Sequence, residues 1–406
     1  MKEVKVVIGA NFGDEGKGLM TDYFCSGKKD RVLNIRFNGT SQAGHTVWRD
    51  GKRHVFSHFG SGSMIPGVAT YLSSDFYFNP VKFFEELHEL IGVDIYPEVY
   101  ISRESEAITI YDIFFNCIIE EARGNSRHGS CGAGLWEALN RVRAGISINA
   151  NDFALGREAL IKKLAIIRDE YYPKRFADMG VAFDDGSEWY DIWYSEIAVQ
   201  NYVDLFFQMS EVVIPADDKE MVNAWDYQVY EGAQGLLLDY GNREYMPNLT
   251  ASYTGSKNVV KLLNLIEDEA DVEICYVTRT YFTRHGAGRF ETETEKSILD
   301  ARLDGTELQE ETNVTNRWQG SFRWGYFDKE LLKKSIARDV KWLWDCRINN
   351  IRRSIAFTHA NLTRDKLLLR NEDLYICDFV REIDGLGGRY RCAYGKTAMD
   401  VCEYGK

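Results

Sequence analysis

Short apolar runs rich in β-branched residues alternate along the chain with longer stretches in which apolar residues recur every three or four positions. The short runs predict strands, and the longer stretches predict helices. The predicted strands cover residues 4–9, 32–37, 98–102, 226–231, 272–278 and 353–358. The predicted helices cover residues 19–26, 80–91, 110–122, 154–170, 192–209, 256–266 and 329–347. Such alternation is typical of an α/β fold with a mostly parallel central sheet flanked by helices.

The chain has 406 residues, a length that allows two or three domains or one large α/β unit. No repeat, low-complexity tract or proline-rich linker divides it, so we expect one elaborated domain over residues 1–406. The stretch 171–190 is aromatic and polar, and we interpret it as an insertion or as a lid over the sheet.

Charge and cysteine content narrow the class of protein. With 49 Lys and Arg against 62 Asp and Glu, the net charge of −13 argues against a protein that coats nucleic acid. No apolar run reaches the ~18 residues of a membrane span, and the first residues lead into a strand without a signal peptide. The eight cysteines form no Cys-x-x-Cys pair and indicate free thiols in a reducing compartment. We therefore expect a cytoplasmic, soluble protein with no nucleic-acid or membrane partner.

The strongest candidate for chemistry is the glycine-rich segment Gly9–Gly18, between the first predicted strand and helix. Glycines let backbone N–H groups approach an anion, the helix N-terminus adds a positive dipole, and Lys17 adds a mobile charge. Asp14 would repel a phosphate unless it binds a metal ion or takes a proton. The segment is not a Walker A loop, because Asn11 stands at the first glycine position and Gly18 follows the lysine. The alternative is a tight turn that binds nothing.

The sequence GDEGKG at 13–18, followed by Gln-Ala-Gly-His-Thr at 42–46, resembles the adenylosuccinate synthetase family. Further segments match that family in order, namely Tyr230–Gly235, Thr283–Gly288, His58 with Ser61 and Gly62, and Gly129–Gly132. The resemblance spans about residues 4–360. It implies a P-loop-related α/β fold with elaborations, and a ligase that forms a carbon–nitrogen bond.

The resemblance implies phosphoryl transfer from a nucleoside triphosphate to O6 of a 6-oxopurine nucleotide, after which the amine of L-aspartate displaces phosphate from C6. It implies that Asp14 is the base and a Mg²⁺ ligand, that His45 is the acid, and that Gly44 offers a carbonyl to Mg²⁺. Lys17 neutralises phosphate charge. The other loop residues implied in nucleotide binding are Gly13, Glu15, Gly16 and Gly18. For His45 alone, the alternative is a buried histidine with satisfied hydrogen bonds.

By the same resemblance, the 5′-phosphate of the purine nucleotide is held by Cys131, Thr250 and an arginine from the other subunit of a homodimer. The family usually has threonine where Cys131 stands, and Ser130 can supply the missing hydroxyl. Arg143 is the best match for the shared arginine, with Arg141 as the rival.

Two glutamines lie near the purine base by resemblance. Gln234 matches the family's base- or phosphate-facing glutamine, and Gln42 stands where the family has asparagine. A changed base pocket can accommodate the 2-amino group of guanine, which would turn an IMP site into a guanylate site.

The segment that reads the donor base also departs from the family. The family binds the guanine of GTP with Thr-Lys-x-Asp, whereas residues 358–361 read Thr-His-Ala-Asn. The amide of Asn361 suits guanine poorly and can match adenine, so we expect ATP or dATP as the donor. The alternative is a GTP site whose sequence has drifted.

The arginine-rich loop that binds L-aspartate in the family is rewritten over residues 312–325. Thr315, Asn316 and Arg323 can still hold a dicarboxylate, and Arg323 can clamp one carboxylate with two bonds. One of the missing arginines normally touches the ribose 2′-hydroxyl, and its loss favours a 2′-deoxy sugar.

Together these departures resemble the viral (bacteriophage) branch of the family, which converts dGMP into N6-succino-2-amino-2′-deoxyadenylate, a precursor of 2-aminoadenine DNA. We therefore expect a ligase that joins dGMP and L-aspartate with hydrolysis of ATP or dATP, through a 6-phosphoryl purine intermediate. Asp14 argues against this reading, because many members of that branch have serine there. An adenylosuccinate synthetase that acts on IMP with GTP is the alternative.

Two readings lie outside this class of enzyme. A P-loop-like NTPase would need a Walker A serine or threonine and an Asn-Lys-x-Asp segment, and both are missing. A nucleotide-binding protein without activity would be favoured by decay of the charged site residues, yet Asp14, Lys17 and His45 are all present.

Overall fold

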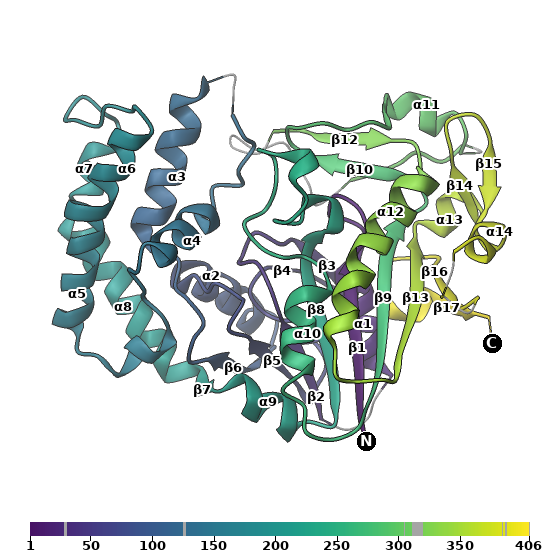
Figure 1. Cartoon of the computed structure of the whole chain (residues 1–406), viewed down its shortest axis with the longest axis horizontal. Coiled ribbons are helices and arrows are strands. Elements are labelled where there is room, and N and C mark those ends of the chain that lie inside the picture. Colours follow the sequence, from purple (N-terminus) through teal and green to yellow (C-terminus); the bar gives the residue numbers. More distant parts are fainter. Residues whose placement is uncertain are drawn as a thin grey trace.

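The computed structural model has a ten-stranded central sheet with helices packed on its faces (Figure 1). It describes residues 1–27, 31–124, 127–303, 305–310, 320–383, 385 and 388–405. The strand pairs of the large sheet are parallel, except for the two strands nearest the carboxyl terminus. The predicted α/β fold with a mostly parallel sheet is therefore confirmed.

From one edge to the other the large sheet contains β17 (Val401–Tyr404), β16 (Tyr390–Ala393), β13 (Ile351–Thr358), β9 (Ala270–Arg279), β1 (Lys2–Gly9), β8 (Tyr227–Gly235), β2 (Val32–Arg36), β5 (Val68–Leu72), β6 (Glu98–Ser102) and β7 (Ile214–Ala216). Smaller sheets pair β3 (His45–Arg49) with β4 (Lys52–Phe56), β14 (Lys366–Leu368) with β15 (Asp373–Tyr375), and β12 (Phe322–Gly325) with β10 (Phe282–His285) and β11 (Glu293–Thr294). The α-helices are α1 (Lys17–Ser26), α2 (Pro80–Ile91), α3 (Ile110–Ala122), α4 (Leu135–Arg143), α5 (Arg157–Ile166), α6 (Tyr172–Asp178), α7 (Tyr190–Trp193), α8 (Glu196–Val212), α9 (Asp218–Ala224), α10 (Ser256–Leu263), α11 (Lys296–Asp300), α12 (Lys329–Val340), α13 (Ala360–Thr363) and α14 (Ile376–Arg381). Within the described residues, no helix has the length and apolar character needed to cross a membrane.

The centre of the sheet is buried on both faces by side chains that alternate along each strand. On β1, Val4, Val6 and Ile8 point to one face, where they share a core cluster with apolar side chains of α10 and α12. Val7 points to the other face and belongs to a separate cluster with Met20 of α1. This burial on two faces explains why the predicted central strands are nearly continuous apolar runs.

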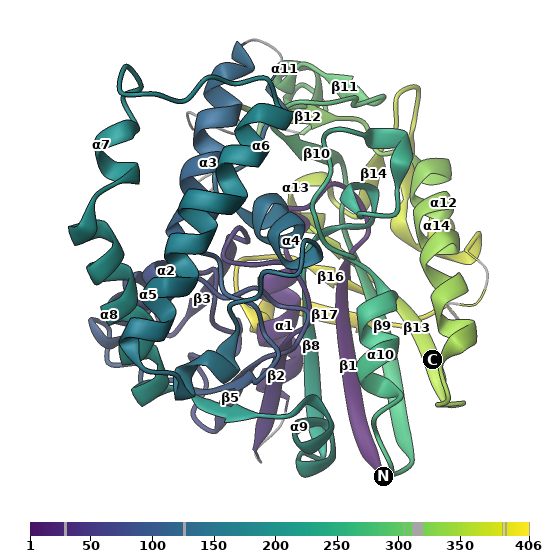
Figure 2. The ribbon, with the colours of Figure 1, turned by 60° about the vertical axis from the view of Figure 1, so that its left-hand side comes forward.

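A helical layer lies beside the sheet, in the left half of Figure 1, and contains α2, α3, α5, α6 and α8. Figure 2 shows α3 beside α6, and α6 continues the helical stretch that begins with α5. The aromatic segment 171–190 contributes to it, because the ring centroids of Tyr172 and Phe176 each lie 4.7 Å from that of Phe115 on α3. The segment is thus an insertion packed among helices rather than a lid over the sheet.

The hairpin of β3 and β4 was not predicted, although it carries one of the predicted catalytic residues, His45. Its turn is Asp50-Gly51, with φ angles of 50° and 77°. Positive φ at both central residues is the geometry of a type I′ turn, and Asp-Gly is a sequence signal for that turn. The signal was therefore present in the sequence, between two short runs that alternate in polarity.

Candidate active site

The glycine-rich loop lies across the carboxyl ends of the central strands. The Thr358 hydroxyl, at the end of β13, donates to the backbone carbonyl of Glu15 at 2.7 Å. The Asn11 amide donates to the Thr278 hydroxyl near the end of β9, also at 2.7 Å. Carboxyl ends of parallel strands are where open α/β sheets bind their ligands, so this position suits the predicted phosphate site.

The buried side chain of Glu15 holds the loop in shape. Its Oε1 accepts the backbone N–H groups of Asn11 and Gly13 at 2.9 and 2.8 Å. Its Oε2 pairs with the Lys17 ammonium at 2.8 Å, and each of these two side chains is only 2% exposed. Glu15 and Gly13 therefore form the support of the loop, while Lys17 faces the cavity described next.

A cavity of about 330 Å³, here called the loop cavity, opens in front of the loop. It gathers predicted site residues from four separate segments of the chain. Those that line it are Asp14, Gly16, Lys17, Gly18, Gln42, Gly44, His45, Gln234 and Asn361. The structure therefore brings these segments together, while the roles predicted for their residues stay predictions.

Asp14 occupies a strained position in this cavity. Its φ is 60°, in the left-handed region that disfavours residues other than glycine, and its carbonyl accepts the Arg279 Nε–H at 2.6 Å. Burial raises the pKa of Asp14, although the charges of Arg279 and Lys17 act to lower it. A carboxylate whose pKa is raised is a stronger base near neutral pH, which is the property that proton abstraction requires.

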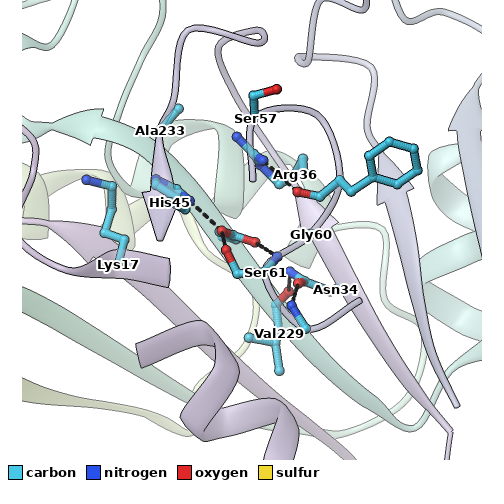
Figure 3. A network of polar contacts seen from close by, with 12 residues as sticks. Lys17, Asn34, Arg36, His45, Ser57, Gly60, Ser61, Val229 and Ala233 are labelled. Atoms are coloured by element: carbon cyan, nitrogen blue, oxygen red, sulfur yellow. Dashed lines mark hydrogen bonds and ion pairs between the residues drawn. The ribbon is translucent and has the colours of Figure 1, made fainter. Parts of the chain in front are cut away.

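His45 is oriented by a buried carboxylate on the neighbouring strand β8. Its Nδ1 lies 2.5 Å from Glu231 Oε1, and the Ser61 backbone N–H donates to Glu231 Oε2 at 2.8 Å (Figure 3). Because a carboxylate only accepts hydrogen bonds, Nδ1 carries the proton and the other ring nitrogen, Nε2, is left for a substrate. This dyad fixes both the tautomer and the direction of the imidazole.

The charge on Glu231 is kept by its surroundings. Burial acts to raise its pKa, but Arg36, His45 and Ser61 outweigh burial and hold the pKa of Glu231 at about 2. Burial in turn lowers the pKa of His45 against the raising effect of Glu231. The imidazole is therefore neutral in the empty cavity, and a bound phosphate dianion is the kind of charge that favours its protonation.

A second cavity of about 280 Å³, here called the distal cavity, adjoins the first. Gln42 and Gln234 line both cavities, which makes them neighbours. The Gln42 amide donates to the Thr250 hydroxyl at 2.8 Å, and the Cys131 thiol donates to the Gln42 carbonyl oxygen at 3.8 Å. Ser130 also lines this cavity, so the residues that the resemblance assigns to one phosphate are gathered here.

The three residues predicted to bind L-aspartate lie outside both cavities or outside the described part of the chain. Arg323 lines neither cavity, and its guanidinium donates to the carbonyls of Gly286 and Gly288 at 3.0 and 2.8 Å. Its predicted contact with aspartate therefore has no support from this arrangement. Thr315 and Asn316 lie outside the described residues, so their predicted role is untested.

The two candidate arginines of α4 differ sharply. The Arg141 side chain is fully buried in an ion pair with Asp112, at 3.0 Å. Arg143 is exposed and donates to the Tyr240 hydroxyl at 2.7 Å. Arg141 is thus part of the core of its own chain, and Arg143 is the one of the two that another molecule can reach.

Several residues of the site were not identified from the sequence. Glu231 belongs to a quoted motif, but only the folded structure shows that its carboxylate meets His45. Arg279 and Lys396 line the loop cavity without belonging to any predicted binding set, and so does Trp48. For Trp48 the available signal was its place two residues after the Gly-His-Thr segment on an alternating run.

Comparisons with known proteins agree with this arrangement. The model of the adenylosuccinate synthetase family matches residues 6–341. The adenylosuccinate synthetase of Lactobacillus acidophilus is 30% identical over 340 residues, which cover 81% of this chain and 73% of that relative. The chain belongs to the adenylosuccinate synthetase family. It is therefore an enzyme, a carbon–nitrogen ligase that joins a purine nucleotide to aspartate with the help of a nucleoside triphosphate.

Other relatives extend the match. The adenylosuccinate synthetase of Borrelia recurrentis is 27% identical over 383 residues, 92% of this chain and 79% of that relative. Fully ligated adenylosuccinate synthetase from Plasmodium falciparum has the same fold, with a TM-score of 0.71 and 16% identity over 98% of this chain and 99% of that one. The succinoaminodeoxyadenylate synthetase of cyanophage S-2L, solved with dGMP and with dATP as energy donor, has a TM-score of 0.59 and 18% identity over 99% and 95%. At these identities the two structures show the fold alone, and the viral branch stays a prediction.

The loop cavity contains two residues that suit a magnesium ion, whose remaining ligands would come from substrate phosphates and water. Adenylosuccinate synthetases use Mg²⁺, and the Asp14 carboxylate and the Gly44 carbonyl both line this cavity. No cluster of three or more His, Cys, Asp or Glu side chains suited to a metal ion is present in the described ranges. One carboxylate and one carbonyl fit Mg²⁺, which binds through few protein ligands together with substrate phosphates and water.

We expect Glu231→Gln to lower kcat by about 10²-fold or more, because glutamine can donate to Nδ1 and so reverse the tautomer of His45. The measurement is steady-state kinetics together with the affinity for the purine nucleotide, which should change little. Glu273→Gln is the matched control, since Glu273 is a buried carboxylate on β9 whose pKa is also held at about 2 and which lines neither cavity. An equal loss of kcat in both variants would contradict the orienting role of Glu231.

We expect the acid limb of kcat/KM to lie above pH 3.8, the ordinary pKa of an aspartate, because the base must be deprotonated and burial raises its pKa. Asp14→Asn should remove this limb and lower turnover by at least about 10²-fold. Asp94→Asn is the control, since Asp94 is an exposed residue with a similar φ of 62° outside the cavity. Near-normal activity of Asp14→Asn would refute the role of Asp14 as base.

Proposed function

We propose that the protein joins L-aspartate to C6 of IMP, with phosphoryl transfer from a nucleoside triphosphate, at the junction of the loop and distal cavities. The observation that carries this proposal is the presence of Asp14, Lys17 and His45 together on one cavity wall, next to a second cavity lined by Ser130 and Thr250. The names of the sequence relatives, which are adenylosuccinate synthetases, support IMP as the nucleotide.

The residues of the chain have complementary tasks in this reaction. Asp14 removes the N1 proton of the purine, so that O6 becomes nucleophilic enough to take the γ-phosphoryl group. Lys17 and His45 Nε2 face the phosphoryl group, and His45 donates a proton to it once imidazolium is favoured. Asp14 and Gly44 would hold Mg²⁺, which would supply charge neutralisation on the phosphate oxygens. The aspartate amine then displaces phosphate from C6.

The second candidate substrate pair is dGMP with ATP or dATP, as expected from the sequence. The observation in its favour is the donor end of the loop cavity, where Asn361 and His359 stand and the family has aspartate and lysine. Burial and the charge of Arg279 lower the pKa of His359 well below its ordinary value, so this position carries no positive charge near neutral pH. A neutral amide and a neutral imidazole recognise guanine less strongly than a carboxylate does.

A matrix of substrates separates the two candidates. IMP, GMP, dIMP and dGMP are each incubated with ATP, dATP or GTP in the presence of L-aspartate and Mg²⁺, and the products are resolved by mass. Turnover of IMP with GTP supports the first candidate, and turnover of dGMP with ATP or dATP supports the second. No succinylated product from any pair would overturn the proposed function.

We expect Asn361→Asp to shift the preference between GTP and ATP toward GTP by about tenfold, because a carboxylate accepts two charge-assisted bonds from the guanine edge. The measurement is the ratio of kcat/KM for the two donors at saturating purine nucleotide. Asn371→Asp, an exposed change that lines neither cavity, is the control for added negative charge. An unchanged ratio would mean that residue 361 does not contact the donor base.

We also propose a homodimer in which Arg143 of one subunit enters the distal cavity of its partner. The exposure of Arg143 on α4 supports this, while Arg141 is occupied by Asp112. Mixing Asp14→Asn chains with Arg143→Ala chains should then restore part of the activity, because one site of each mixed dimer has both residues intact. If Arg143 acts within its own subunit, every site of the mixed dimer lacks one residue and no recovery is expected.

A further inference from the structure

The far end of the loop cavity contains an aromatic side chain that the reaction described above does not use. Trp48 lines the cavity together with Asn361, Leu362 and Lys396. Among the described residues it belongs to none of the five apolar core clusters, so core packing does not explain its presence. Trp48 also lines a separate cavity of about 560 Å³, so its side chain lies between two cavities.

The strand β3 leads from the catalytic end of the cavity to Trp48. His45 and Val47 are buried on one side of this strand, while Thr46 and Trp48 alternate with them and are partly exposed. Thr46 also lines the loop cavity, and a two-residue step along a strand spans about 6.6 Å. Trp48 thus lies on the same face of β3 as Thr46, one two-residue step further along the strand.

Lys396 is a neighbour of Trp48, and two other residues that line the same cavity are of the kind that a purine base needs. The Lys396 ammonium lies 5.4 Å from the centroid of the indole ring, within the range of a cation–π contact. Leu362 supplies an apolar wall, and Asn361 supplies an amide for the polar edge of a base. An aromatic face, an aliphatic side chain and one amide together make a slot for a flat heteroaromatic ring.

We propose that Trp48 is a binding residue for the phosphoryl donor, whose purine base stacks on the indole ring while its edge faces Asn361. The proposal rests on the proposed function only in taking the ligand of this end of the cavity to be a nucleoside triphosphate. Stacking on an aromatic ring accepts any base, because every base has a π face. Trp48 therefore adds affinity for adenine and guanine donors alike, and the choice between them belongs to Asn361.

The test compares probes with and without a base. Binding of adenylyl imidodiphosphate, guanylyl imidodiphosphate and inorganic tripolyphosphate, each with Mg²⁺, is measured by calorimetry for the wild type, Trp48→Leu and Trp48→Phe. We expect Trp48→Leu to weaken both nucleotides by about 5- to 150-fold and to leave tripolyphosphate within a few-fold. Trp48→Phe should recover most of the loss, because phenylalanine keeps an aromatic face.

Trp344→Leu is the control, since Trp344 is 78% exposed and lies outside the loop cavity, and it should bind all three probes like the wild type. Equal weakening of all probes by Trp48→Leu would show a structural role and overturn the proposal. Unchanged nucleotide binding would overturn it as well.

Kinetics separate this proposal from the proposed function. With wild-type enzyme that forms a succinylated product, Trp48→Leu should raise KM for the donor but not for the purine nucleotide or for aspartate. If the wild type forms no such product yet the three binding probes differ as expected, the proposed function fails and the role of Trp48 stands.

Discussion

The active site depends on one buried carboxylate that never reaches the cavity, that of Glu15. It binds two backbone N–H groups of the loop and the ammonium of Lys17, and so sets the path of the chain on both sides of Asp14. The requirement for space around it is strict. A Cβ at Gly9 would lie 2.4 Å from Glu15 Oε2, and one at Gly235 would lie 2.5 Å from Oε1, so both positions need glycine. Two glycines 226 positions apart in the sequence thus make room for the same side chain, and the carbonyl of Asn11, 2.3 Å from a Cβ at Gly235, adds a backbone constraint.

Glu231 plays the corresponding part on the other side of the site. Neither Glu15 nor Glu231 lines the cavity, yet each fixes a group that does, Lys17 in one case and His45 in the other. Each also has a positive charge near it, Lys17 for Glu15 and Arg36 for Glu231, because an unpaired carboxylate would be costly away from water. A protein with a net charge of −13 can therefore present cationic and proton-donating groups to a phosphate while Glu15 and Glu231 remain behind the cavity wall.

The sequence predicts the central sheet and the glycine-rich loop better than it predicts the small hairpin and the long-range contacts between side chains. The central strands are long apolar runs buried on both faces, and such runs are easily recognised, as is the strand–loop–helix unit that holds Asp14. The β3–β4 hairpin was missed because its strands have only five residues each, although Asp50-Gly51 gave a turn signal. The contact of His45 with Glu231 spans 186 positions and depends on how the β3–β4 hairpin packs near β8 of the large sheet, which local patterns do not contain. The sequence makes Arg143 the best match and Arg141 its rival by resemblance alone, and the ion pair of Arg141 with Asp112 gives a physical difference between them.

The opposite pKa shifts of Asp14 and His45 bear on how donor binding relates to the proposed chemistry. Burial raises the pKa of Asp14 and lowers that of His45, so the neutral imidazole is favoured near neutral pH and needs added negative charge before it takes a proton. A triphosphate in the loop cavity brings negative charge next to His45, which favours the imidazolium that can donate to the phosphoryl group. Without that added charge the same histidine is neutral, and its Nδ1–H donates to the carboxylate of Glu231. In the proposed reaction, binding of the triphosphate therefore favours the protonated form of His45. Proton donation by His45 is then restricted to the complex that contains the donor.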